Sequence, residues 1–200
     1  MKNFKMFFYI ITMHMLISCN SNHTEIVELY IKLPKSDIDM YGCLKEDSDK
    51  IRINLIDDKY LTETYLEFSE PCNGANCALA LLENEQNKYL LLKGHEININ
   101  SKNAGIKIYL IREGKLSLLE KDLIFFDKEK TDEYIKNHPD YKKIFKVFNG
   151  SIPYEIKLPK EGNELELFIN EDFLNQEISI TSFGKFTFKD EMYIFLYESL

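Results

Sequence analysis

Short stretches in which apolar and charged side chains alternate recur along most of the chain, and they constrain its fold more than any other feature. In residues 25–33, every second residue from Val27 to Leu33 is apolar, which is the spacing of a strand with one buried face. Residues 51–57 repeat this pattern. Further strands are predicted to begin near Leu61, Cys77, Lys88, Glu96, Ile106, Leu116, Ile152, Asn163, Gln176, Lys185 and Met192. Polar turns separate these segments, so the sequence predicts a mainly β fold, either an antiparallel β-sandwich or a barrel-like sheet.

One short segment has a helical period instead. Residues 141–148 place large apolar side chains at positions i, i+3, i+4 and i+7, while Pro139 suits a first helical turn and Gly150 a C-terminal cap. Thr131 is predicted to cap a shorter helical stretch that ends at residues 137–139. We therefore expect one short helical segment beside the strands.

The pentapeptide IKLPK occurs at residues 31–35 and again at residues 156–160, each time at the end of a predicted strand. It indicates either a duplication of two sandwich halves, with a boundary near residues 130–150, or a coincidence among common residue types. A chain of about 180 residues can fill one core or two smaller ones. Residues 25–200 are accordingly predicted to form one β-rich domain or two sub-domains.

The N-terminus has the residue order of a secretory signal. Lys2 and Lys5 precede an apolar run over residues 6–17, which is too short to span a bilayer. Residues 16–18, Leu-Ile-Ser, then lead directly into Cys19. This arrangement resembles the signal peptide and lipobox of bacterial lipoproteins.

The resemblance implies a location and a modification. In that family the signal is cut just before the cysteine, so residues 1–18 would be removed and Cys19 would be acylated. Residues 20–24 would then form a short tether to the membrane. The chain is thus expected on the bacterial cell envelope, at the outer membrane or cell surface, with the membrane as its partner through the lipid on Cys19.

Charge disfavours nucleic acid as a partner. The chain has 25 Lys and Arg residues and 33 Asp and Glu residues. Residues 1–18 contain two lysines and no acid, so the remainder carries 25 minus 2, or 23, basic residues against 33 acidic ones. Binding to phosphates depends on clustered basic residues, and the only arginines are Arg52 and Arg112. A basic protein partner is compatible with this charge.

The cysteines predict a disulfide bond. In an oxidising compartment, the sequence PCNGANC is typical of a bond between Cys72 and Cys77 that closes a hairpin turned by Asn73 and Gly74. Cys43 is then a leftover thiol, and a bond from Cys43 to either of the other two remains an alternative.

No residue pattern predicts a catalytic, cofactor or metal site. A nucleophilic cysteine with His95 or His138 as its base lacks an orienting third group in the sequence. The histidines have no zinc spacing, the acidic turns lack the order of a calcium-binding loop, and nucleotide-binding glycine motifs are missing. We therefore expect no cofactor and no resident metal.

Three functions are compatible with these observations. The preferred one is a non-catalytic binding or structural module on the cell envelope, with a protein of unknown identity as a possible partner. The second is an inhibitor or immunity-type protein that neutralises a basic enzyme. The third is a hydrolase whose site has no recognisable motif.

Overall fold

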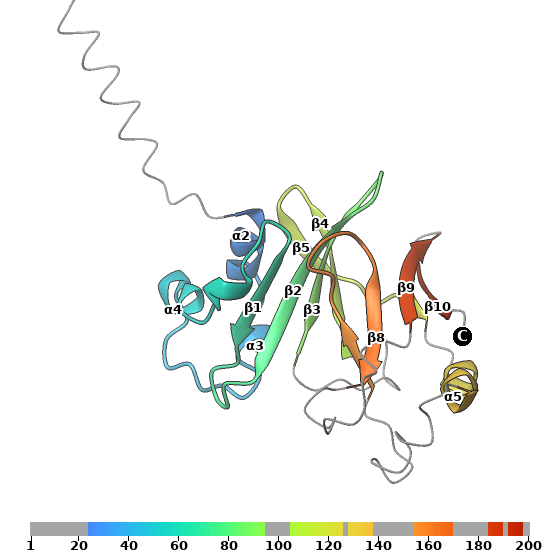
Figure 1. Ribbon diagram of the computed structural model, residues 1–200. Coiled ribbons are helices and arrows are strands. Elements are labelled where there is room, and N and C mark those ends of the chain that lie inside the picture. Colours follow the sequence, from blue (N-terminus) through green and yellow to red (C-terminus); the bar gives the residue numbers. More distant parts are fainter. Residues whose placement is uncertain are drawn as a thin grey trace, which may run out of the picture.

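The computed structural model describes residues 24–94, 105–125, 128–137, 154–169, 184–189 and 192–197. These residues form two β-sheets and several short helices (Figure 1). The prediction of a mainly β fold is confirmed. Cys19 and the signal predicted at residues 1–18 lie outside the described residues.

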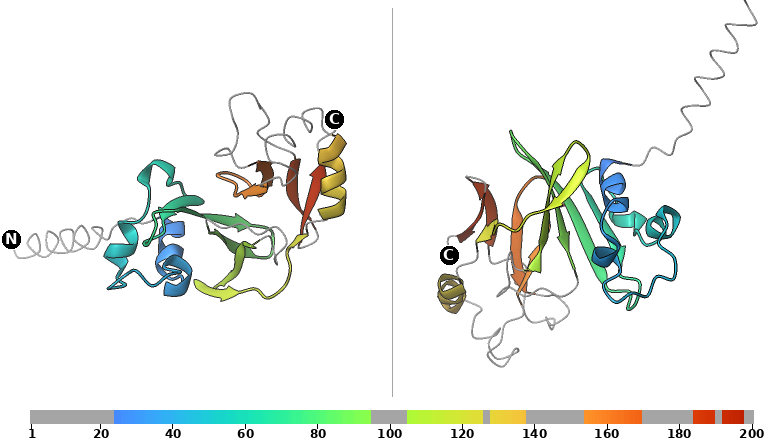
Figure 2. Two further views of the ribbon diagram at one scale, coloured as in Figure 1. Left: turned by 90° about the horizontal axis from the view of Figure 1, so that it is seen from below. Right: turned by 180° about the vertical axis from the view of Figure 1, so that it is seen from behind.

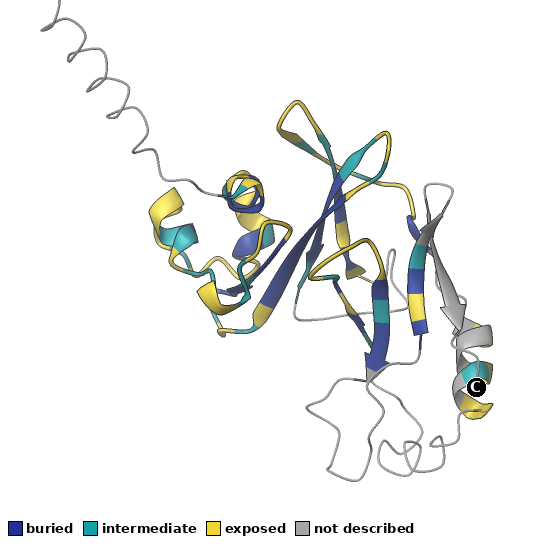
Figure 3. Ribbon diagram, turned by 45° about the horizontal axis from the view of Figure 1, so that its top comes forward, coloured by how far each residue is buried: buried dark blue, intermediate teal, exposed yellow. Residues whose placement is uncertain are grey.

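The first sheet, which we call the meander sheet, takes its strands in sequence order. It consists of β1 (Tyr65–Ser69), β2 (Asn76–Glu83), β3 (Lys88–Lys93), β4 (Lys107–Arg112) and β5 (Lys115–Leu118), each antiparallel to its neighbours. Strands β2 and β3, in the interior of this sheet, are buried along almost their whole length (Figure 3). Their sequences, CALALL and YLLL, are continuously apolar because both faces of this sheet are covered.

The second sheet, which we call the C-terminal sheet, covers one of these faces. It consists of β6 (Ile124–Phe125), β7 (Tyr154–Lys157), β8 (Leu165–Ile169), β9 (Gly184–Lys189) and β10 (Met192–Tyr197), in the order β6-β10-β9-β8-β7. The pairing of β6 with β10 is parallel and the other pairings are antiparallel. Residues of both sheets share one apolar core, which includes Ala80, Leu91, Ile108, Ile156, Leu165, Leu167 and Phe186. Of the two predicted arrangements, the structure therefore has the sandwich.

Short helices cover the other face of the meander sheet (Figure 2). They are α2 (Glu25–Ile31), α3 (Lys35–Ile38), α4 (Asp49–Ile53) and the 3-10 helix η1 (Asp58–Tyr60). The Tyr30 ring of α2 packs on the Phe68 ring of β1, with a centroid separation of 4.9 Å. The meander sheet is thus the middle of three layers.

The predicted strand at residues 25–33 is wrong, because this segment begins with helix α2. Its side chains fit a helical period equally well: Ile26, Leu29, Tyr30 and Leu33, at i, i+3, i+4 and i+7, are all buried. Apolar spacing alone could not distinguish a strand from a helix in this segment. Ile26 begins a set of apolar residues at helical spacing, and the adjacent Val27 begins a set at strand spacing. The helix forms because it packs these apolar side chains against one face of the meander sheet.

The predicted strand at residues 51–57 is also wrong. Helix α4 occupies its first half, and extended pairing is limited to a single bridge between Ile56 and Phe68. Two backbone hydrogen bonds flank this bridge, from Ser69 N to Leu55 O and from Asp57 N to Glu67 O. The segment therefore covers the outer edge of β1 without forming a full strand.

Most of the other predicted strands are present in the structure. The strands expected near Leu61, Cys77, Lys88, Ile106, Leu116, Ile152, Asn163, Lys185 and Met192 are present as β1–β5 and β7–β10. Helix α5 (Lys128–Asn137) begins three residues before Thr131, so Thr131 is not its cap. The helix predicted at residues 141–150 and the strands predicted near Glu96 and Gln176 lie outside the described residues.

The two IKLPK copies have different structures. The first spans the end of α2 and the start of α3, whereas the second spans the end of β7 and the turn after it. The repeat therefore gives no support to a duplication. The proposed boundary near residues 130–150 falls largely outside the described residues and stays a prediction. Within the described part of the chain, no helix is long and apolar enough to cross a membrane.

Candidate functional site

A turn after helix α3 forms the first half of the candidate site. The buried carboxylate of Asp39 accepts hydrogen bonds from two backbone amides, Cys43 N at 2.7 Å and Leu44 N at 2.9 Å. Gly42 has a φ of +74°, a conformation that glycine adopts without steric cost. We call residues 39–44 the Asp39 loop, since one side chain holds its backbone in place.

The turn between β1 and β2 forms the second half. Glu70 is 1 % exposed, and its Oε2 accepts hydrogen bonds from Cys72 N at 2.8 Å and Asn73 N at 3.0 Å. The Asn73 side chain accepts from Ala75 N, and Gly74 has a φ of +69°. Asn73 and Gly74 therefore turn the chain here as predicted, and we call residues 70–75 the Glu70 turn.

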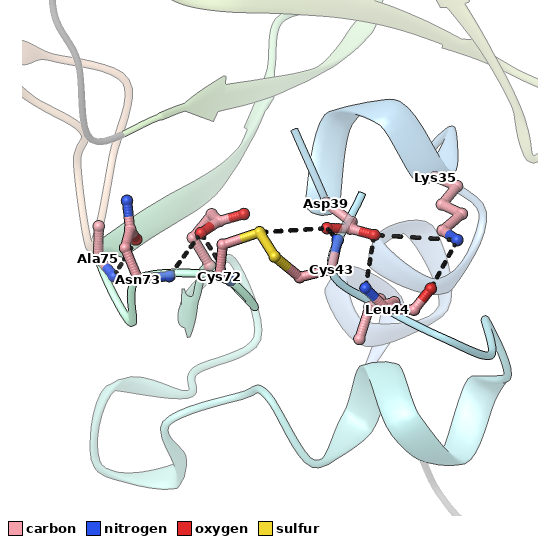
Figure 4. The surroundings of a disulfide bond; sticks show 8 residues. Lys35, Asp39, Cys43, Leu44, Cys72, Asn73 and Ala75 are labelled. Atoms are coloured by element: carbon pink, nitrogen blue, oxygen red, sulfur yellow. Dashed lines mark hydrogen bonds and ion pairs between the residues drawn. A yellow bond between two sulfur atoms is a disulfide. The ribbon is translucent and has the colours of Figure 1, made fainter. Parts of the chain in front are cut away.

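A disulfide bond between Cys43 and Cys72 joins the two halves (Figure 4). The Cα atoms are 5.3 Å apart and the cysteines are separated by 29 positions in the sequence. The predicted Cys72–Cys77 bond is therefore wrong, and the alternative partner Cys43 is the correct one. Cys77 lies on β2 opposite Phe68, 3 % exposed, in the core beneath the helices.

The Cys43–Cys72 bond closes a much longer loop than the predicted bond would. A bond from Cys72 to Cys77 would close only a tight turn, for which the chain-entropy model gives about 2 kcal/mol. The Cys43–Cys72 bond closes a loop that contains α4, η1 and β1. For a loop of this length the same model gives about 3.5 kcal/mol. The bond thus fastens the helical layer to the meander sheet.

Charged groups surround the sulfur atoms. Asp39 Oδ1 lies 4.0 Å from Cys72 Sγ, and Asp39 Oδ2 lies 3.8 Å from Lys35 Nζ. The Asp39 side chain is fully buried, whereas that of Lys35 is 44 % exposed. Lys35 Nζ also donates to Leu44 O at 3.0 Å. A positive charge and two backbone amides therefore compensate the buried carboxylate.

The same place brings together three side chains that can bind metals. Single ligand atoms of Asp39, Cys43 and Cys72 all lie within 4.8 Å of one another. The sequence did not indicate this group, because its members come from the Asp39 loop and the Glu70 turn, which are far apart along the chain. In the disulfide form the two sulfurs are not thiolates, and thiolate is the form of cysteine that binds metals.

Two large apolar side chains project from the Asp39 loop. Met40 is 43 % exposed and Tyr41 is 57 % exposed. Methionine and tyrosine are enriched in protein–protein interfaces, where their burial contributes strongly to affinity. A pre-ordered loop that displays such side chains can bind a partner with little loss of conformational entropy.

The Asp39 loop lies at the far end of the domain from residue 24. Glu25, at the start of α2, pairs with Lys88 at the start of β3, with 3.2 Å between Oε2 and Nζ. Met40 Cε lies beside Gly94, which follows the last residue of β3. The start of α2 and the Asp39 loop therefore lie at opposite ends of strand β3, and Figure 1 shows α2 above α3.

A buried arginine supports the helical layer behind this site. Arg52 donates from Nη1 to Ile31 O at 2.8 Å and to Leu33 O at 2.7 Å. It also forms two bonds of 2.6 Å to the Asp47 carboxylate, from Nε and Nη2. These bonds lower the pKa of Asp47, while burial raises the pKa of the nearby Tyr30 hydroxyl. Arg52 thus satisfies the last carbonyl of α2 and that of Leu33 just after it, and connects that helix to α4.

The histidines considered as bases, His95 and His138, lie outside the described residues, as does His23. No pairing of Cys43 with a histidine can therefore be described, and the disulfide occupies Cys43 in this structure. The described residues include no histidine.

Comparison with known proteins identified no relative. No family model matches the chain, and neither the curated proteins nor the solved structures contain a significant match. The function of this chain must therefore be inferred from its own residues and geometry.

Proposed function

We propose that this chain is a lipid-anchored protein of the bacterial cell envelope whose domain acts as a non-catalytic binding module. The lipobox-like sequence before Cys19 supports the anchor. The Cys43–Cys72 bond carries the proposal, because disulfide bonds persist in oxidising compartments outside the cytoplasm. It supports export from a part of the chain that is independent of the signal sequence.

The binding role is supported by the position and rigidity of the Asp39 loop. A lipid on Cys19 would hold the start of α2 near the membrane, because only residues 20–24 intervene. The loop with Met40 and Tyr41 would then face away from the membrane. The disulfide and the Asp39 carboxylate both restrain this loop, so its exposed side chains are held ready for a partner.

Replacement of the lipidated residue tests the anchor. In a bacterial host, the full chain is expected in the membrane fraction with an acylated Cys19 at its N-terminus, and Cys19→Ala is expected to remain unprocessed and unacylated. Ser18→Ala is the matched control, since it keeps a small residue before the cysteine and should be processed normally. An unmodified Cys19 still joined to residues 1–18 in the wild type would contradict the proposal.

Site-specific crosslinking tests the binding role. A photoreactive amino acid at position 41 is expected to form a discrete adduct on intact cells. The control is the same group at position 118, because Leu118 is a similarly exposed apolar residue, 48 % exposed, on β5. Adducts at both positions or at neither would contradict a specific partner at the Asp39 loop.

A further inference from the structure

We propose that Asp39, Cys43 and Cys72 form a binding site for a thiophilic divalent cation such as Zn²⁺ when the disulfide is reduced. The disulfide form is then the closed state of the site and the dithiol form its binding state. This inference goes beyond the proposed binding role and does not depend on it.

The ligand set suits zinc. Two thiolates and one carboxylate are three of the ligands that zinc prefers, and a water molecule can complete a tetrahedron. At ordinary zinc–ligand distances, neighbouring ligand atoms lie about 3.5 Å apart. Cys72 Sγ is already 4.0 Å from Asp39 Oδ1, so a small movement of side chains is sufficient.

Hydrogen bonds that do not involve sulfur hold both cysteines in place. Asp39 accepts from the backbone amides of Cys43 and Leu44, and Glu70 accepts from those of Cys72 and Asn73. Each carboxylate is buried and reaches its own turn. Reduction of the disulfide leaves these contacts intact, so the two thiols stay close enough to bind one ion.

A second observation concerns Glu70, whose carboxylate holds the backbone of Cys72. Glu70 Oε1 is buried, and among the described residues it has no hydrogen-bond partner. The other oxygen of the same carboxylate contacts the amide of Cys72. An unpaired buried carboxylate oxygen is costly, and a cation bound beside Cys72 would offset that cost.

The chemistry of opening is a thiol–disulfide exchange. A dithiol reductant transfers two electrons and two protons to the Cys43–Cys72 bond, which becomes two thiols, while the reductant closes its own disulfide. Cys43 is exposed, so a reductant can reach the bond. The ion then displaces the two thiol protons to water. Two thiolates, the Asp39 carboxylate and the divalent ion leave one negative charge, which Lys35 balances at 3.8 Å from Asp39.

The test compares oxidised and reduced protein. The full chain carrying Cys19→Ala is purified, reduced with a dithiol and desalted without oxygen. Zn²⁺ is then titrated against a chromophoric chelator, and Co²⁺ is added separately to record thiolate-to-cobalt charge-transfer absorbance. We expect one Zn²⁺ per reduced chain, sulfur-ligated Co²⁺, and no comparable binding by the oxidised chain.

Variants separate the proposed ligands from other groups. Cys72→Ser should abolish the tight site, and Asp39→Asn should weaken it at least about tenfold, because each removes a ligand. Cys77→Ala and Asp49→Asn are controls, a cysteine and a carboxylate outside the group, and should bind as the parent does. Circular dichroism should show that the reduced parent remains folded.

Several results would overturn the proposal. These are a reduced parent that binds no Zn²⁺, equal binding by the oxidised and reduced chains, retention of the tight site in Cys72→Ser, or its loss in Cys77→Ala. Unfolding of the parent on reduction would also overturn it, because the site is proposed to persist without the disulfide.

Discussion

The two faces of the meander sheet are covered in different ways. The C-terminal sheet covers one face mainly through a core of apolar side chains, supplemented by a part-buried ion pair between Lys93 of β3 and Glu155 of β7. The helical layer covers the other face through apolar contacts and a disulfide. Within that layer a buried arginine joins the helices, and two buried carboxylates hold the two turns that the disulfide links. The two covering elements are therefore attached to the meander sheet in different ways.

Element length explains this difference. Helices α2, α3 and α4 have 7, 4 and 5 residues, and helices this short are not stable without tertiary contacts. Their terminal carbonyls also need partners, and Arg52 supplies one to Ile31 at the end of α2. The strands of the C-terminal sheet satisfy their own backbone groups through pairing, so they are attached mainly by apolar contact, with the Lys93–Glu155 ion pair beside it.

Substitution of two neighbouring leucines tests how the two faces of the meander sheet differ, and it has the largest expected effect. Leu90 and Leu91 on β3 are both 0 % exposed, but Leu90 contacts the helical layer and Leu91 the core shared with the C-terminal sheet. We expect Leu91→Ala to cost about 4 kcal/mol and Leu90→Ala about 3 kcal/mol, because short helices can move to fill a cavity more easily than a paired sheet. Denaturant unfolding measures the loss of stability in both variants. A larger loss for Leu90→Ala would contradict the expectation that the helical layer adjusts to a cavity more easily.

Removal of the disulfide tests the attachment of the helical layer. We expect the double variant Cys43→Ser with Cys72→Ser to lose about 3 kcal/mol of stability and to remain folded. Amide hydrogen exchange should accelerate in residues 25–60 and change little in β7–β9. Uniform acceleration across both regions would show that the bond does not act locally on the helical layer.

A conservative change at Arg52 tests the polar contacts that join the helices of this layer. Arg52→Lys keeps the charge but cannot reach Asp47 and both carbonyls at once, so we expect a loss of about 2 kcal/mol. Arg112→Lys is the control, since Arg112 is exposed on β4 and should change stability by less than about 0.5 kcal/mol. Thermal unfolding of both variants measures the difference, and equal stabilities would contradict the role of Arg52.

The pH dependence of stability gives the smallest expected effect. The hydrogen bonds from Arg52 lower the pKa of Asp47 in the folded state. Because the pKa is lower in the folded than in the unfolded chain, the ionised carboxylate stabilises the fold above about pH 4. That contribution is lost as the pH falls through the folded pKa. Asp47→Asn should flatten this part of the melting profile between pH 5 and 2 relative to the wild type, and an unchanged profile would contradict the role of this carboxylate.

Much of the strand content could be predicted from the sequence. Residues such as Leu90 and Leu91 lie in short apolar runs bounded by polar turns, and the turn at Asn73 and Gly74 follows from residues that adopt the required backbone angles. The failures at residues 25–33 and 51–57 have one cause. In segments this short, apolar spacing fits a strand and a helix about equally. The surface on which the segment packs therefore determines which of the two it forms.

At the candidate site, too, some features follow from the sequence and others only from the tertiary structure. The sequence by itself determined that the turn after β1 would be tight, and it indicated that Cys72 in this turn would form a disulfide. Only the tertiary structure decided that Cys43 is the partner, because the fold places the Asp39 loop beside the Glu70 turn and leaves Cys77 in the core. Turn geometry depends on adjacent residues and can be inferred locally, whereas the meeting of two loops 29 positions apart depends on how the helices pack on the meander sheet.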